Sequence, residues 1–216
     1  AEQAIGAYSR AVAMNPDYAE AFNNMGNAYV ELARASDAII AYSKAYRRNQ
    51  ELPGVLSNMA NALRQHGQHE EAEKAVREAI RRNPLAWESH LCLGLILRER
   101  GRVKEAIKAY EQGIAINPAN ADLENNLAGA YEALGEFSTA ESHYILALEI
   151  ERRHYSAMRN LACIAKGDNV QVLKEYMSKA VRERPSLAND LEFTESVASL
   201  GSEYSERIFG SRLERI

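Results

Sequence analysis

The feature that most constrains this chain is an internal repeat with a step of 34 residues. The turn glycines Gly67, Gly101 and Gly135 follow one another at this step. Small residues and tyrosines keep the step in three further series: Ala4, Ala38, Ala72, Ala106 and Ala140; Tyr8, Tyr42, Val76, Tyr110 and Tyr144; and Ala11, Ala45, Ala79, Gly113 and Ala147. A period of this length predicts a stack of similar units that share one continuous core.

Each 34-residue window is predicted to form two helices. In the first full window, Phe22, Met25 and Tyr29 fall on one helical stripe of a helix over 19–32. A second helix is expected over 36–49, with its small residues facing the first helix. Asn-Pro pairs recur at the ends of second helices, where proline disfavours a helical conformation in the residue before it.

The segments NNMGNAY…DAIIAYSKAY and CLGLILRERGRVKEAIKAYEQGIAINP carry this pattern, which resembles the tetratricopeptide repeat (TPR). The windows are also similar to those of O-linked N-acetylglucosamine transferases and bacterial TPR proteins. The resemblance implies an all-α solenoid, a right-handed superhelix of antiparallel helix pairs. It also implies that first helices line the concave face.

The resemblance covers residues 1–187, and 188–216 are expected to form a degenerate sixth repeat or, as we prefer, capping helices. Within the array we predict a half repeat at 1–18 and full repeats at 19–52, 53–86, 87–120, 121–154 and 155–187. Because the chain opens without methionine and part-way through a repeat, an upstream segment is expected.

Composition and motifs argue against several function classes. The net charge of −4 gives no reason to expect nucleic acid as a partner, and no stretch has the roughly 18 apolar residues of a membrane span. The five histidines lack zinc-ligand spacing, and phosphate loops and nucleophile elbows are missing. We therefore expect no catalysis, no metal and no cofactor. Cys92 and Cys163 are interpreted as reduced thiols, which favours a cytoplasmic location.

Asparagines recur on the predicted first helices and form a candidate ladder. They occupy three positions of the windows: the sixth (Asn24, Asn58, Asn126 and Asn160), the fifth (Asn23 and Asn125) and the ninth (Asn27 and Asn61). An amide offers both donors and an acceptor, so the ladder suits the backbone of an extended peptide. Hydrogen bonding between adjacent repeats would satisfy the same amides, and both interpretations remain open here.

The third window departs from this pattern. Cys92 stands at the sixth position, with Leu91 and Leu95 at the fifth and ninth, while Arg64 and Arg98 hold the twelfth position of windows two and three. We expect an apolar pocket with basic walls that accepts a hydrophobic residue beside an acidic one. The alternative is that both leucines only pack against neighbouring helices.

The sequence therefore predicts a non-catalytic scaffold that binds a peptide or helix of a partner protein in the concave groove. A second hypothesis is a substrate-recognition module from a larger enzyme, such as a glycosyltransferase or sulfotransferase. A third is self-assembly into homo-oligomers through the first helix, 1–14, whose apolar edge carries Ile5 and Val12.

Overall fold

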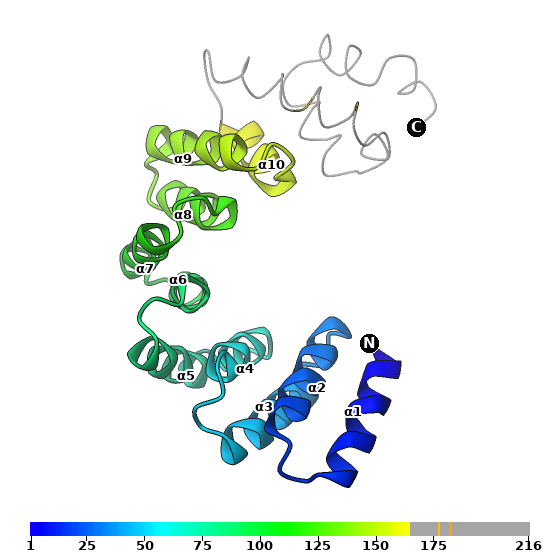
Figure 1. The fold of residues 1–216 in the computed structure, drawn as a ribbon. Helices are drawn as coiled ribbons and strands as arrows, with labels where there is room; N and C mark the ends of the chain where they lie inside the picture. The colour runs from blue at the N-terminus through cyan, green and yellow to red at the C-terminus, as the bar shows by residue number, and fades with distance from the viewer. Residues whose placement is uncertain (165–176, 178–181, 183–216) are drawn as a thin grey trace. The chain divides into compact units, whose positions relative to one another are not determined.

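The computed structural model describes residues 1–164 together with Met177 and Arg182. Regular structure in this part of the chain is entirely α-helical, which confirms the predicted all-α fold (Figure 1). The helices, in chain order, are α1 (Glu2–Met14), α2 (Ala19–Glu31), α3 (Ala35–Arg48), α4 (Val55–Gln65), α5 (His69–Arg82), α6 (Trp87–Glu99), α7 (Val103–Ile116), α8 (Ala121–Ala133), α9 (Phe137–Ile150) and α10 (Tyr155–Ile164).

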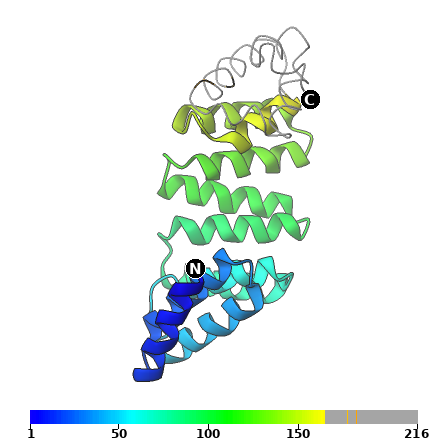
Figure 2. The ribbon, with the colours of Figure 1, turned by 90° about the vertical axis from the view of Figure 1, so that its right-hand side faces the viewer.

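The helices belong to two compact units, Ala1–Ile116 and Asn117–Ile216. In the first unit, α2 pairs with α3, α4 with α5, and α6 with α7, and α4 also contacts α2 and α6. In the second, α8 lies side by side with α9, and α10 contacts both (Figure 2). The name first-helix face is used below for each unit separately: it is the side formed by α2, α4 and α6 in the first unit, and the side formed by α8 and α10 in the second.

The helices of a pair approach closely because small residues face large rings. A Cβ atom at Gly26 would lie 2.5 Å from Cε1 of Tyr42, well inside van der Waals contact. Gly94 meets the ring of Tyr110 in the same way, and Ala38 is completely buried. Glycine at this position therefore lets the tyrosine of the second helix lie flat against the first.

The turn inside each pair requires a left-handed backbone. Gly67, Gly101 and Gly135 have φ values of 80°, 74° and 78°. Glycine adopts this conformation without the steric penalty that a Cβ atom brings. The first pair uses Ala33 instead, at φ 56°.

Helix α1 is covered by its neighbour. Ile5 is buried in a cluster with Met25 of α2, and Val12 packs against the same cluster. The two residues expected on an open edge thus face α2, and self-assembly through them remains only a prediction.

No helix among the described residues is long and apolar enough to cross a membrane. The C-terminal part of the window at 155–187, apart from Met177 and Arg182, lies outside the described residues, as does the predicted cap at 188–216.

Candidate functional site

Asparagine side chains link successive first helices through hydrogen bonds. Nδ2 of Asn58 on α4 donates to Oδ1 of Asn23 on α2 at 3.2 Å and to Oδ1 of Asn27 at 3.4 Å. The second unit repeats the arrangement, since Nδ2 of Asn160 on α10 donates to Oδ1 of Asn125 on α8 at 3.2 Å. In both units, therefore, the sixth-position amide is bonded to the fifth-position amide of the preceding pair.

These bonds use the donors of the ladder and leave acceptors open. Within the described residues, Oδ1 of Asn58 and Oδ1 of Asn160 receive no hydrogen bond, and the exposed amide of Asn24 makes none. Nδ2 of Asn126 donates to the main-chain oxygen of Asp122 in its own helix at 2.7 Å. The ladder thus presents carbonyl oxygens on the first-helix face, suited to receiving N–H groups.

The ninth-position asparagines have partners in their own repeat. The hydroxyl of Tyr42 donates to Oδ1 of Asn27 at 2.7 Å, and burial raises the pKa of Tyr42 to about 12, so the hydroxyl keeps its proton. The second pair has Val76 in place of this tyrosine. There, Arg64 donates to Oδ1 of Asn61 at 3.0 and 3.3 Å.

The third pair lacks an acceptor for its tyrosine. In the fourth pair, Tyr144 donates to Glu132 at 2.8 Å, whereas the buried hydroxyl of Tyr110 has no partner among the described residues. Leu95 and Arg98 hold the ninth and twelfth positions of the third pair, and neither side chain can accept a hydrogen bond.

In the third window, Cys92 does not lie where the sequence predicts it. Cys92 is only 7% exposed and lies in an apolar cluster formed by α4, α5 and α6, so it is not on the first-helix face. Burial raises the pKa of its thiol to about 12, which leaves it protonated and unreactive. Leu91 and Leu95 are half-buried, and Nη1 of Arg64 pairs with Glu99 at 2.5 Å. The pocket with basic walls remains a prediction.

A cavity of about 510 Å³ borders the ladder at Asn58, and sequence reasoning missed it. Ser57 and Ser89 contribute to its wall, and their hydroxyl oxygens lie 2.7 Å apart. Much of the remaining wall of this cavity is formed by the loop over 50–54 and by Arg82. Ser57 occupies the fifth position of its window, the position of Asn23 and Asn125, which is the one sequence signal that could have pointed to it.

Metal and disulfide chemistry find no support among the described residues. No group of three or more histidine, cysteine, aspartate or glutamate side chains there is placed to hold a metal ion. Both cysteines are free, Cys92 buried and Cys163 exposed.

Comparison with known proteins identifies the repeat. Tetratricopeptide and TPR repeat family models match residues 1–32, 19–52, 57–121 and 97–162. No curated protein matches the sequence.

Several solved structures are similar to the chain. MamA is 26% identical, with a TM-score of 0.61 over 68% of this chain and 86% of its own. TTC0263, a thermophilic TPR protein in Thermus thermophilus, is 20% identical, with a TM-score of 0.67 over 84% and 98%. YrrB, described as a TPR protein with an unusual peptide-binding site, is 19% identical, with a TM-score of 0.58 over 83% and 93%. The last two support the fold alone. The chain therefore belongs to the tetratricopeptide repeat family and has the all-α solenoid fold of that family.

Proposed function

We propose that this chain is a non-catalytic scaffold that binds an extended segment of a partner protein on its first-helix face. The family consists generally of protein–protein interaction modules. The observation that carries the finer proposal is the pattern of amide bonds, which fixes Asn58 and Asn160 in place and leaves their Oδ1 atoms without a donor in the part of the chain that the structure describes. An extended peptide presents N–H groups at regular intervals whatever its side chains are, and these acceptors can receive them.

Magnitudes limit what the asparagines can contribute. A hydrogen bond adds about 0.5–1.5 kcal/mol net, whereas association costs about 4–15 kcal/mol in lost freedom. The sixth-position asparagines of either unit alone therefore give weak binding that tolerates many sequences. The cavity beside Asn58 offers room for a side chain of the bound segment, and burial of that side chain would add affinity and selectivity.

Asn24 provides the sharpest test because its amide is exposed and makes no hydrogen bond within the described structure. Peptides selected by display from a random library on the wild-type protein serve as probes. We expect Asn24→Ala and Asn58→Ala each to weaken the dissociation constant of a selected peptide about 2- to 12-fold, the loss of one hydrogen bond. Methylating the peptide nitrogen that donates to one of these asparagines should weaken binding by a similar factor.

Asn23→Ala is the matched control, since it removes one of the two acceptors of Asn58 Nδ2 but leaves Oδ1 of Asn58 in place. If the amides only join repeats, Asn23→Ala and Asn58→Ala will both lower stability, and neither Asn58→Ala nor Asn24→Ala will change the affinity. That result, or a library that yields no saturable binder, would refute the proposal.

A further inference from the structure

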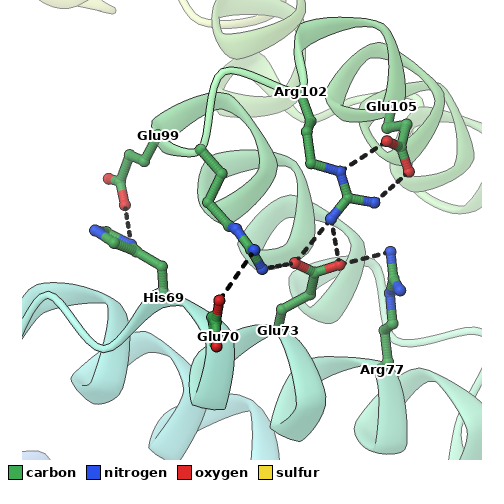
Figure 3. Close-up of polar contacts among 8 residues, drawn as sticks. His69, Glu70, Glu73, Arg77, Glu99, Arg102 and Glu105 are labelled. Carbon is green, nitrogen blue, oxygen red and sulfur yellow. Dashed lines mark hydrogen bonds and ion pairs between the residues drawn. The ribbon is translucent and has the colours of Figure 1, made fainter.

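A buried carboxylate gathers three arginines where α5 meets the turn before α7 (Figure 3). Glu73 is 5% exposed. Its Oε1 lies 2.8 Å from Nη2 of Arg77 and 2.7 Å from Nη1 of Arg102, and Nη1 of Arg100 donates to Oε2. Burying a lone carboxylate is unfavourable, and these charge-assisted bonds offset that penalty. Glu73 thereby fixes three guanidinium groups around one point.

The arginines keep part of their surface open to solvent. The side chains of these arginines are between 29% and 51% exposed, whereas the side chain of Glu73, taken without its main chain, is 7% exposed. Arg77 uses only Nη2 in its bond to Glu73, so its other N–H groups have no partner within the described residues. The ammonium of Lys74 is likewise unpaired there.

These side chains line a cavity of about 240 Å³ that has an excess of positive charge. Its wall consists of four cations and two carboxylates: Lys74, Arg77, Arg100 and Arg102, with Glu70 and Glu73. Two further carboxylates lie nearby. Glu99 pairs with Arg64 outside the cavity, whereas Glu105 bonds Arg102 through both of its oxygens. The lining alone has an excess of two positive charges, and Glu105 reduces this excess to one.

We infer that this cavity binds the phosphoryl group of a phosphoserine or phosphothreonine on a partner protein. A phosphoryl group presents three strong acceptor oxygens and up to two negative charges to the free donors of Arg77 and Lys74, whereas a carboxylate presents two oxygens and one charge. The volume is below the roughly 300 Å³ of pockets that enclose whole small-molecule ligands. The lining contains no aromatic ring on which a nucleotide base could stack. A phosphorylated side chain, whose peptide remains outside the cavity, fits these limits.

The site lies apart from the asparagine ladder and shares no residue with it. It therefore goes beyond the proposed binding of an extended peptide. If no peptide binds at Asn24 and Asn58, the inference of a phosphoryl-binding cavity is unaffected.

Titration with N-acetyl-O-phosphoserine amide tests the inference directly. At pH 7.5 and constant ionic strength, we expect saturable NMR shifts of the Nε–Hε signals of Arg77 and Arg100. Lys74→Gln should weaken binding of this compound at least 3-fold, and the double variant Lys74→Gln/Arg77→Gln at least 10-fold. Arg81→Gln is the matched control, because this arginine of the same helix pairs with Glu78 outside the cavity.

The pH dependence supplies a second readout. The second pKa of a phosphate monoester is about 6, so lowering the pH from 7.5 to 5 converts the ligand to a monoanion and should weaken its binding several-fold. Sulfate keeps its charge over this range and should bind equally at both values. N-acetyl-aspartate amide should bind more weakly than the phosphoserine compound at pH 7.5.

Three results would overturn the inference: no saturable shift at these arginines, an equal loss of affinity in Arg81→Gln, or equal affinity for the aspartate compound. Lys74→Gln breaks no hydrogen bond of the described structure, so the test holds even if the double variant fails to fold.

Discussion

Ala33 occupies the turn position that glycine fills in the next three helix pairs. Its φ of 56° is left-handed, a conformation in which a Cβ atom crowds the following carbonyl oxygen at a cost of about 1–2 kcal/mol. The residue is exposed, so no packing interaction compensates for this strain. The first pair therefore contains a local strain that the next three pairs avoid.

Replacing Ala33 by glycine should relieve that strain. We expect Ala33→Gly to raise the free energy of unfolding by about 1 kcal/mol, somewhat less than the strain because glycine also gains freedom in the unfolded chain. Gly101→Ala, the reverse change at the equivalent turn, should lower it by a similar amount. Urea unfolding followed by circular dichroism measures both. A loss of stability in Ala33→Gly would contradict this account of the turn.

At the scale of elements, an arginine at the end of α5 joins two successive pairs. Arg82 donates to the main-chain oxygen of Gln50 at 2.6 Å and to the hydroxyl of Tyr46 at 2.9 Å. Glu78, one turn earlier, accepts from Arg81 and Arg82 at 2.7 Å. Hydrogen bonds from Arg81 and then Arg82 lower the pKa of Glu78 to about 2. The carboxylate therefore holds Arg82 in position for its contact with the preceding loop.

Stability on the acid side should depend on Glu78. Because its folded pKa lies below the ordinary value of 4.5, its stabilising contribution is complete above pH 4.5 and is lost as the pH falls towards 2. Glu78→Gln should remove this part of the pH dependence and leave a shallower curve between pH 4.5 and 2. Thermal unfolding of both proteins over this range provides the measurement. Parallel curves would show that Glu78 does not contribute.

The start of α10 is held by a histidine. Nδ1 of His154 accepts the main-chain N–H of Ala157 at 3.1 Å, and Nε2, which therefore carries the proton, lies 3.0 Å from Oδ1 of Asp122. The ring thus caps α10 and connects it to α8.

Removing this ring should expose α10 to local unfolding. We expect His154→Ala to cost about 0.5–2 kcal/mol through the lost cap and to accelerate hydrogen exchange of the α10 amides. His154→Asn, whose oxygen can receive the same N–H, should preserve most of the protection. Equal exchange in α10 of both variants would argue against capping.

At the scale of the whole molecule, the fold was predictable because its contacts repeat within one window. Gly26, Ala38 and Tyr42 meet inside a single helix pair, so their spacing in the sequence predicts their contact in space. The sequence also predicted hydrogen bonds between adjacent repeats, such as that of Asn58 to Asn23, as one of two possible uses of the amides, because the 34-residue step relates the first helices. Both kinds of contact depend on periodicity rather than on the orientation of individual side chains.

Contacts that depend on side-chain orientation between pairs were not predictable. Glu73 meets Arg102 only because the turn before α7 places that arginine over α5, and no repeated position signals this. Cys92 was expected on the first-helix face because it holds the window position at which asparagine recurs in the other windows. A thiol lacks the polarity of an amide, so it can lie in the apolar cluster between α4, α5 and α6.

The division into two compact units leads to a last prediction, on how the molecule unfolds. In repeat arrays, stability is approximately a sum of local terms and contacts between neighbours. Gly94→Ala places a Cβ atom into the ring of Tyr110 and should cost about 1–3 kcal/mol by overpacking. We expect hydrogen exchange to accelerate in α6 and α7, while α8 and α9 of the second unit keep their protection.

Gly6→Ala is the control for this experiment, because a Cβ atom there meets only the end of the Arg10 side chain, at 3.9 Å. Alanine should stabilise α1 by about 0.5–1 kcal/mol through its helix propensity. If Gly94→Ala instead accelerates exchange equally in α6 and α9, the two units unfold as one cooperative structure. In that case a change at a single helix pair would lower the population of the folded state throughout the described chain, including the asparagines of both units.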